Sequence, residues 1–474
     1  MKRLASGLTL LLSLLAGCAT VGPDYVPSEV SAPAHWTAEL EGGLTAKHVD
    51  TQALANWWTA LNDPILSSLI ERAVAGNLDL KEARARVREA RARRGISQAD
   101  RFPTIDTTVS ASQNHSSKET GSGETRELYA AGFDASWELD LFGGIRRSVE
   151  AAEAELRASE EDLRDVLVSF IAEVGMNYVE VRLFQTRLSI AEANLDTQTE
   201  TYNITQWRFE AGLTTQLDVE QARYNLEQTR SQIPTLQTGF EQARNRLAVL
   251  LGQHPGFLKD ALAEPKAIPV TPLEVAIGLP ADVLRRRPDV RRAERQLAAQ
   301  TAQVGVATAD LYPKFYLIGS IGLEALSPGN LFLSCSRASA IGSNIGWTIF
   351  DAGRIRQNIK VQTAVQEQAL IQYEAAVLTA LAEVENALVA YADEQVRRRS
   401  LVKASQAAQH AVDLAQNQYV SGRIDFQVVL DTQRSLLSLQ DQLATSEGEV
   451  TYNLITLYKA LGGGWTSLVP DENK

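Results

Sequence analysis

The chain contains an internal duplication, and this feature constrains the fold more than any other. The segment Ala99–Pro103 recurs as Ala309–Pro313, which is an offset of 210 residues. The same offset relates pairs at three other places: Trp137, Gly143, Ile145 and Arg146 with Trp347, Gly353, Ile355 and Arg356; Phe209 and Gly212 with Tyr419 and Gly422; Leu251 and Gly252 with Leu461 and Gly462. Four separate matches at one offset are hard to obtain by chance, so we expect two halves built on one plan.

Each half is predicted to contain a helix, two strands, a very long helix and a further helix, in that order. Pro64 suits the first turn of a helix, whereas Pro103 and Gly212 each end one. The expected ranges in the first half are 64–100 for the first helix, 116–127 for the loop between the strands, 143–211 for the long helix and 215–251 for the last helix. The second half begins near Pro280, and its corresponding helices are expected at 354–421 and 425–461.

The N-terminus has the features of an export signal. Lys2 and Arg3 precede the apolar stretch Leu8–Leu15, and the stretch ends in Leu15-Ala16-Gly17-Cys18. This pattern resembles a bacterial lipobox, in which a diacylglyceryl group is attached to the cysteine, although an ordinary signal peptide remains the alternative. No run of eighteen or more apolar residues follows Cys18, so no transmembrane helix is expected.

Six regions are therefore expected along the chain. They are a signal peptide at 1–17, a lipidated and extended N-terminal segment at 18–63, the first repeat at 64–251, a proline-containing linker at 252–279, the second repeat at 280–461 and a C-terminal tail at 462–474.

Each predicted strand alternates apolar and polar residues. In Tyr129–Asp140 the odd positions are apolar or aromatic, and the even positions are small or acidic. In an exported protein this alternation indicates one face toward lipid and one toward water. Trp137 and Trp347 near the strand ends fit an aromatic girdle at the membrane surface. A soluble sheet packed on the helices is the alternative, but the long charged helices offer no broad apolar face to cover it.

Four strands are too few to close a barrel, which takes about eight, and unpaired strand edges are not tolerated in lipid. We therefore expect three copies to supply twelve strands. The long helix would measure about 100 Å at 1.5 Å per residue. Its apolar residues recur at threes and fours between Leu163 and Leu195, as in a coiled coil. The predicted fold is a mixed α and β membrane protein, in which a trimeric twelve-stranded β-barrel continues into a periplasmic α-helical barrel. An isolated periplasmic coiled coil would not explain the four strands.

Composition excludes several other classes of function. The chain has 58 Asp and Glu against 46 Lys and Arg, which argues against nucleic acid or anionic membrane surfaces as partners. Cys335 is the only cysteine besides Cys18, so neither an intrachain disulfide nor a thiolate cluster is expected in the mature chain. The five histidines are scattered, and we find no catalytic triad, phosphate-binding loop or metal motif, so the chain is not predicted to be an enzyme.

Several short motifs resemble those of the TolC-like outer-membrane factors, in the OprM-like (NodT-type) lipoprotein group, and together they cover essentially the whole chain. They are Cys18 with Val21–Tyr25; Trp57-Trp58 with Asp63-Pro64; Asn77, Leu80 and Ala83; Pro288–Val290; Trp347 with Phe350–Gly353; and Gln418–Gly422 with Val429–Asp431 and Gln433-Arg434. The resemblance implies a homotrimeric duct without cofactors other than the lipid on Cys18. It implies three partners: a periplasmic adaptor protein, an inner-membrane pump of the resistance-nodulation-division type, and outer-membrane lipid.

The resemblance also implies a closed periplasmic end, at which Asp218, Tyr419, Asp431 and Arg434 match the constriction residues of the family. Asp218 is expected to accept a hydrogen bond from Tyr419 across neighbouring hairpins, and three copies of Asp431 would form an acidic ring that favours cations. Alternatives remain: Asp431 and Arg434 form an ordinary i,i+3 pair, or Tyr419 only packs between helices. Gln427 stands where an apolar residue is common, which puts a hydrophobic plug in doubt.

The hairpin tips at Gly212 and Gly422 are the predicted adaptor docking points, although each glycine could serve only as a left-handed helix cap. The leading function is the exit duct of a tripartite efflux system for small molecules. An exit duct for ATP-driven protein secretion and a non-conducting periplasmic scaffold remain as alternatives. The sequence leaves the cargo, the particular pump and adaptor, and the role of Cys335 undetermined.

Overall fold

The computed structural model describes residues 20–27, 32–47, 50–272 and 274–465, and these form two compact units. Unit 1 contains the described residues before 28 together with 85–160 and 292–375; unit 2 contains the described residues of 32–84, 161–291 and 376–465. Each repeat therefore contributes to both units, because the long helices pass from one unit into the other. The boundary between the repeats is not a boundary between compact units.

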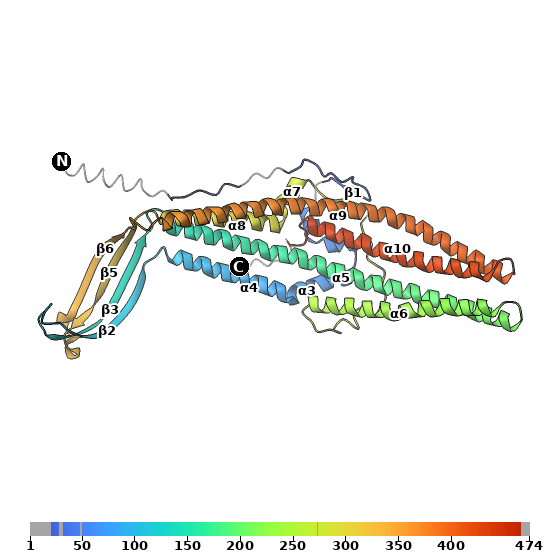
Figure 1. Ribbon diagram of the computed structural model, residues 1–474, viewed down its shortest axis with the longest axis horizontal. Coiled ribbons are helices and arrows are strands. Elements are labelled where there is room, and N and C mark those ends of the chain that lie inside the picture. Colours follow the sequence, from blue (N-terminus) through green and yellow to red (C-terminus); the bar gives the residue numbers. More distant parts are fainter. Residues whose placement is uncertain (1–19, 28–31, 48–49, 273, 466–474) are drawn as a thin grey trace. The chain divides into compact units, whose positions relative to one another are not determined.

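Eight helices account for most of the described chain (Figure 1). They are α3 (Pro64–Gly76), α4 (Leu78–Ala99), α5 (Gly144–Glu210), α6 (Gln216–Leu250), α7 (Pro280–Arg286), α8 (Pro288–Ala309), α9 (Arg354–Val420) and α10 (Phe426–Ala460). The long helices and their partners agree with the expected ranges to within one residue at each end. In unit 2, α5 turns back into α6 and α9 turns back into α10, which makes two helical hairpins.

The helix expected over 64–100 is in fact two helices, and this prediction was wrong for a non-local reason. Asn77 has an extended ψ of 138° and separates α3 from α4. Its side-chain Oδ1 accepts from the backbone N–H of Leu80 (2.9 Å), and its Nδ2 donates to the carbonyl of Leu250 (3.2 Å). Asn77 thus caps one helix and satisfies the end of another.

The same break recurs 210 residues later at Arg287, which separates α7 from α8. Arg287 has ψ 124°, as expected for the residue before a proline, and its guanidinium donates to the carbonyl of Ala460 (2.9 Å). Ala460 is the counterpart of Leu250. Two different side chains therefore make the same contact in the two repeats.

The strands of unit 1 form one antiparallel sheet in the order β2-β3-β5-β6 (Figure 1). These strands are β2 (Thr104–His115), β3 (Thr125–Leu139), β5 (Lys314–Ala325) and β6 (Arg337–Gly346). All four expected strands are present. β3 begins within the segment expected to be a loop, and β6 ends before Trp347. Two short 3-10 helices, η2 (Pro328–Asn330) and η3 (Ser334–Ser336), lie between β5 and β6.

The strand register places most of the large apolar residues of the four strands on one face, with Ile318 an exception on the other. Directly paired residues share a face. The pairs include Thr107 with Phe133, Phe133 with Ile321, Trp137 with Leu317, Gly319 with Ile341 and Phe315 with Ile345. The opposite face carries the line Asp106, Asp134, Ser320 and Ala340. The sheet therefore has one apolar and one polar surface, as the alternation predicts.

Unit 2 contains the main hydrophobic core. Trp57 is 1% exposed and stacks on Tyr458 with ring centroids 5.6 Å apart. Part of this core comes from residues expected to be extended: α2 (Thr51–Ala55) and the 3-10 helix η1 (Trp57–Leu61) lie within 18–63. β1 (Leu44–Thr45) pairs in parallel with β4 (Val275–Ala276) of the linker, so a two-stranded sheet joins segments that the sequence analysis left unpaired.

One helix among the described residues, α9, is long and apolar enough to cross a membrane by length and composition alone. The sequence analysis expects no such helix. Helices buried in the cores of soluble proteins also pass this test. In unit 2 the residues Val384, Leu388 and Tyr391 of α9 are fully buried in the core, so packing accounts for part of its apolar character.

Candidate functional site

The two hairpin tips of unit 2 have the same backbone closure. Gly212 has φ +76° and Gly422 has φ +72°, a left-handed conformation that favours glycine. The N–H of Leu213 donates to the carbonyl of Arg208 (2.7 Å), and that of Arg423 donates to the carbonyl of Gln418 (2.9 Å), as in a Schellman cap. A Cβ built on either glycine would meet no atom within 4 Å. Both tips thus have the local cap geometry, and the space beside both glycines is open.

Asp218 serves first as a helix-capping residue. Its Oδ2 accepts from the Thr214 hydroxyl (2.6 Å), the Thr215 N–H (3.0 Å) and the Thr215 hydroxyl (2.8 Å). Together with the Thr215 side chain, which accepts from the Asp218 N–H, this forms a capping box at the start of α6. Burial opposes ionisation of Asp218, but the hydrogen bonds from Thr214 and Thr215 outweigh it and lower the pKa of the carboxyl group.

Tyr419 is buried at the end of α9 and does not contact Asp218 within the chain. Its ring packs on Phe426 at 5.1 Å between centroids, and the guanidinium of Arg208 lies over the ring at 4.7 Å. Its hydroxyl is buried and has no hydrogen-bond partner among the described residues. A bond between Tyr419 and Asp218 therefore has to be formed between two copies if it exists.

Asp431 and Arg434 lie one turn apart on α10 and form a loose ion pair of 3.9 Å. Asp431 also accepts from the side-chain amide of Gln427 (2.9 Å). Arg434 donates to Asn225 of α6 (2.9 Å) and lies over the Tyr224 ring at 5.5 Å. Asp431 is exposed, whereas Arg434 joins the two hairpins. The structure brings Asp431, Arg434 and Tyr419 to the distal part of the α9–α10 hairpin, while Asp218 stays at the other tip.

Sequence reasoning did not predict that Arg208, Asn225 and Thr201 connect the hairpins here, and it named Gln433 only within a family motif. Gln433 is 2% exposed and donates to the Thr201 hydroxyl (2.8 Å). These residues occupy positions where the two repeats differ, since 208 and 418 are Arg and Gln. The repeats also differ at most other positions of these helices, so this difference does not single the residues out.

Trp137 and Trp347 occupy equivalent positions in unit 1. The indole N–H of Trp137 donates to the carbonyl of Arg101 (2.9 Å), and that of Trp347 donates to the carbonyl of Leu311 (3.1 Å). Their side chains are 36% and 58% exposed. Each tryptophan ties the end of a strand to the turn that follows α4 or α8, and each keeps an exposed ring at the sheet surface.

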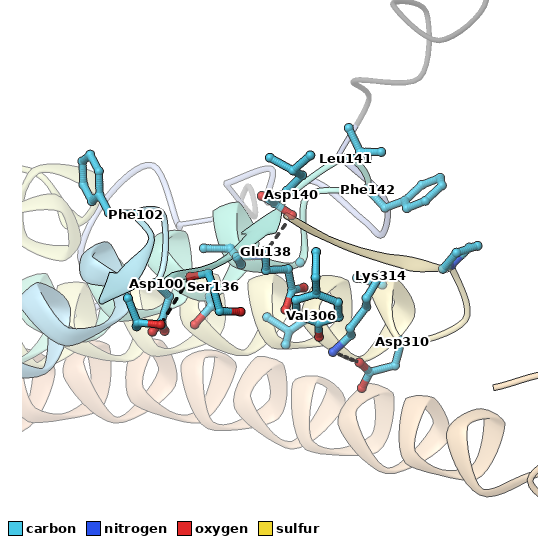
Figure 2. Close-up of a pocket in the computed structure, with 18 residues that line it drawn as sticks. Asp100, Phe102, Ser136, Glu138, Asp140, Leu141, Phe142, Val306, Asp310 and Lys314 are labelled. Carbon is cyan, nitrogen blue, oxygen red and sulfur yellow. Dashed lines mark hydrogen bonds and ion pairs between the residues drawn. The ribbon is translucent and has the colours of Figure 1, made fainter. Parts of the chain in front are cut away.

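A polar pocket of about 370 Å³ lies where the strands of unit 1 meet the helices (Figure 2). Four carboxylates line it together with Lys314: Asp100, Glu138, Asp140 and Asp310. Lys314 pairs with Asp310 at 3.1 Å, and Asp140 accepts from the backbone N–H groups of Ile145 and Arg146 at the start of α5. These contacts cap helices and balance charge, so they account for the polar lining without a ligand.

Arg147 holds the N-terminal segment against unit 1. It is 3% exposed, and it donates to the Val21 carbonyl (3.1 Å) and pairs with Asp24 at 2.6 Å. The Val21 N–H in turn donates to the Phe142 carbonyl (3.1 Å). Cys18, the expected lipidation residue, lies outside the described residues. The backbone is therefore held against unit 1 from Val21 onward, which is three residues after Cys18.

The described part of the chain contains no group of three His, Cys, Asp or Glu side chains placed to hold a metal ion. Cys335 is exposed and free.

Comparisons with known proteins agree with this architecture. The sequence model of the family described as "Outer membrane efflux protein" matches residues 69–253 and 279–463, two stretches separated by the same 210-residue offset. The chain belongs to this family. It is an outer-membrane channel component of an efflux system with a periplasmic extension, a transport protein and not an enzyme.

Individual relatives match over nearly their whole length. The chain is 34% identical to Nodulation protein T of Rhizobium leguminosarum bv. trifolii, over 95% of this chain and 96% of the relative. It is 33% identical to the Pyoverdine export outer membrane protein OpmQ of Pseudomonas aeruginosa (96% and 97%) and 30% identical to the Probable outer membrane lipoprotein SilC of Salmonella typhimurium (95% and 96%). Among solved structures, the outer-membrane channel OprN matches with a TM-score of 0.89 at 40% identity, over 94% of this chain and 99% of that one.

Proposed function

We propose that three copies of the chain assemble into one duct. The observation that carries this proposal is the open four-stranded sheet, whose edge strands β2 and β6 have no further strand partner among the described residues and whose one face is mainly apolar. In lipid such edges must be paired, and twelve strands close a barrel. The expected result is a trimer by mass measurement of the detergent-purified protein. A stable monomer would contradict the proposal.

A matched pair of substitutions tests which face of the sheet meets lipid. Val109 lies on the apolar face of β2 and is 79% exposed, and its neighbour Ser110 lies on the polar face. Val109→Arg should reduce insertion into the outer membrane, because arginine at mid-membrane costs about 2–4 kcal/mol. Ser110→Arg should insert normally. Equal insertion of both variants would overturn the assignment of the faces.

The lipid anchor is proposed to be a diacylglyceryl group on Cys18. The motif Leu15–Cys18 supports it, as does the similarity to SilC, whose name describes it as a probable outer membrane lipoprotein. Labelled palmitate should enter the wild-type protein and should not enter Cys18→Ser. Incorporation that persists in Cys18→Ser would place the anchor elsewhere. Partial function of this variant is compatible with the proposal, because the barrel can insert without the lipid.

The two hairpin tips are proposed to dock a periplasmic adaptor protein, through which the duct couples to an inner-membrane pump. Open space beside Gly212 and Gly422 supports this, since a partner backbone can approach closely there. Gly212→Trp and Gly422→Trp should keep the trimer but lose cross-linking to the adaptor. Gly256→Trp is the control, because Gly256 also has positive φ and open surroundings but lies in the linker. Cross-linking retained in both tip variants would place the contact elsewhere.

The distal part of the α9–α10 hairpin is proposed to form the constriction. Asp431 is exposed and would form a ring of three carboxylates in the trimer, while the Tyr419 hydroxyl is buried without a hydrogen-bond partner among the described residues and would have to turn outward to reach a neighbouring copy. Asp431→Asn should weaken cation preference, with Asp413→Asn on α9 as the control. Tyr419→Phe combined with Asp218→Ala should raise the conductance of the closed state. If all variants conduct and select like the wild type, the constriction lies at another level.

A resistance-nodulation-division pump for small molecules is the proposed partner system. Relatives with full-length similarity carry names that include pyoverdine export and toluene efflux, and these support a small-molecule cargo for this chain. Protein secretion predicts a neighbouring gene for an ATP-driven exporter instead of a pump and adaptor. A scaffold without a pore predicts no conductance in planar bilayers.

A further inference from the structure

A polar seam connects α5 with the second hairpin of unit 2. Four residues of α5 at heptad spacing, Arg187, Asn194, Thr201 and Arg208, make its contacts. Arg187 pairs with Asp441 of α10 at 2.7 Å, Asn194 donates to Gln440 (2.8 Å), and Thr201 accepts from Gln433 (2.8 Å). The guanidinium of Arg208, the fourth of these residues, lies over the ring of Tyr419 of α9. Polar residues at such positions fix the register of a helix pair and weaken its packing.

The seam contains side-chain amides without partners. Gln198 lies between Asn194 and Thr201 and is only 3% exposed, yet neither atom of its amide has a hydrogen-bond partner among the described residues. The Oε1 of Gln433 is likewise buried and unpartnered. A buried polar group without a partner destabilises the arrangement that buries it, whereas the same group loses nothing when water reaches it.

A cleft of about 440 Å³ lies beside the seam and is lined by six carboxamide side chains: Asn194, Gln198, Gln409, Gln416, Gln433 and Gln440. It is large enough to admit water. A small separation of α5 from α10 would therefore expose the Gln198 amide to water in the cleft. The Gln198 amide lacks hydrogen bonds in the arrangement described, and it would form them with water if the helices separated.

We propose that Gln198 biases this seam toward opening, so that the closed duct is held only weakly and an adaptor can open it with little work. This inference rests on the proposed duct. It assigns the control of duct opening to positioning residues of the seam, which lie away from the constriction. Arg187, Asn194 and Thr201 each pair with a residue of α10, and these pairs determine the register in which α5 and α10 pack when the seam is closed.

Two substitutions should shift the seam in opposite directions. Gln198→Leu keeps the side-chain size and removes the unpartnered amide, so the closed seam should gain on the order of tenfold in population per subunit. Thr201→Val is nearly isosteric but leaves the buried Gln433 amide without its one partner, so it should favour the open seam by a similar factor. A general disturbance of packing would shift both variants the same way.

Hydrogen exchange of the full-length trimer measures the seam without reliance on conductance. Amides of 190–205 and 430–442 should exchange more slowly in Gln198→Leu and faster in Thr201→Val than in the wild type. Planar-bilayer recording should show fewer openings in the first variant and more in the second. Exchange in Gln198→Leu that equals or exceeds the wild type overturns the inference. A wild-type trimer that never conducts would instead contradict the proposed duct, while the exchange result still decides the role of Gln198.

Discussion

Gly212 and Gly422 close their hairpins with φ values only a few degrees apart, yet different side chains stabilise the two tips. At the first tip Thr215 and Asp218 form a capping box, and the aromatic residue Phe209 is 38% exposed. At the second tip Asp425 makes no side-chain cap bond, and Tyr419, the counterpart of Phe209, is 7% exposed in a cluster with Phe426. One tip is therefore stabilised by polar local capping, and the other by aromatic packing.

The largest difference between the tips is expected on removal of Phe426. Its side chain is 3% exposed and packs on Tyr419, so Phe426→Ala should destabilise the second tip by about 3–5 kcal/mol. Gln216→Ala, at the exposed counterpart position of the first tip, should change stability by less than about 0.5 kcal/mol. Hydrogen exchange of the tip amides measures both. Unchanged protection around 412–434 in Phe426→Ala would show that packing does not stabilise this tip.

Substitution of the two glycines should affect both tips equally. Alanine in the left-handed conformation costs about 1–2 kcal/mol, and open space beside both glycines adds no clash. Gly212→Ala and Gly422→Ala should therefore lower the local unfolding free energies by the same amount. Asparagine, which tolerates this conformation, should cost less at both positions. Clearly unequal losses would mean that the backbone closures differ in solution.

Removal of the capping residues should affect mainly the first tip. Thr215→Ala removes the bond to the Asp218 N–H and should cost about 1 kcal/mol. Asp425→Ala removes a carboxylate near a helix N-terminus but no hydrogen bond, so it should cost at most about 0.5 kcal/mol. The exchange rates of the first turns of α6 and α10 test the order of these effects. A larger loss in Asp425→Ala would contradict it.

The smallest expected effect is a pH dependence confined to the first tip. Because the folded pKa of Asp218 lies below its ordinary value of 3.8, its ionisation stabilises the tip above that value. This contribution should be lost as the pH falls through the folded pKa. Asp218→Asn should remove the dependence, and the second tip, which has Val428 at the equivalent position, should show none from this source. If both tips lose the same stability as the pH falls, the pH dependence comes from groups other than Asp218.

The interruption of the predicted 64–100 helix at Asn77 and the equivalent break at Arg287 show how far local sequence predicts the helices. Pro288 indicates the second break, because the residue before a proline avoids the helical conformation. Nothing as strong indicates the first, where Asn77 follows Gly76. What selects an extended Asn77 is the carbonyl of Leu250, more than 170 residues away. The pairing of β1 with β4 and the stacking of Trp57 on Tyr458 depend in the same way on contacts distant in sequence.

The sequence by itself determined the duplication, the ranges of the long helices, the four strands and the apolar face of the sheet. These follow from periodicity and from caps formed within a few residues, so the local chain contains the information. Only the tertiary structure decided how the polar residues between the helices are used: Gln433 donates to Thr201 of a distant helix, whereas the Tyr419 hydroxyl and the Gln198 amide are buried without hydrogen-bond partners among the described residues. Whether a polar group is satisfied depends on which distant helix faces it, and that is fixed only when the helices pack together.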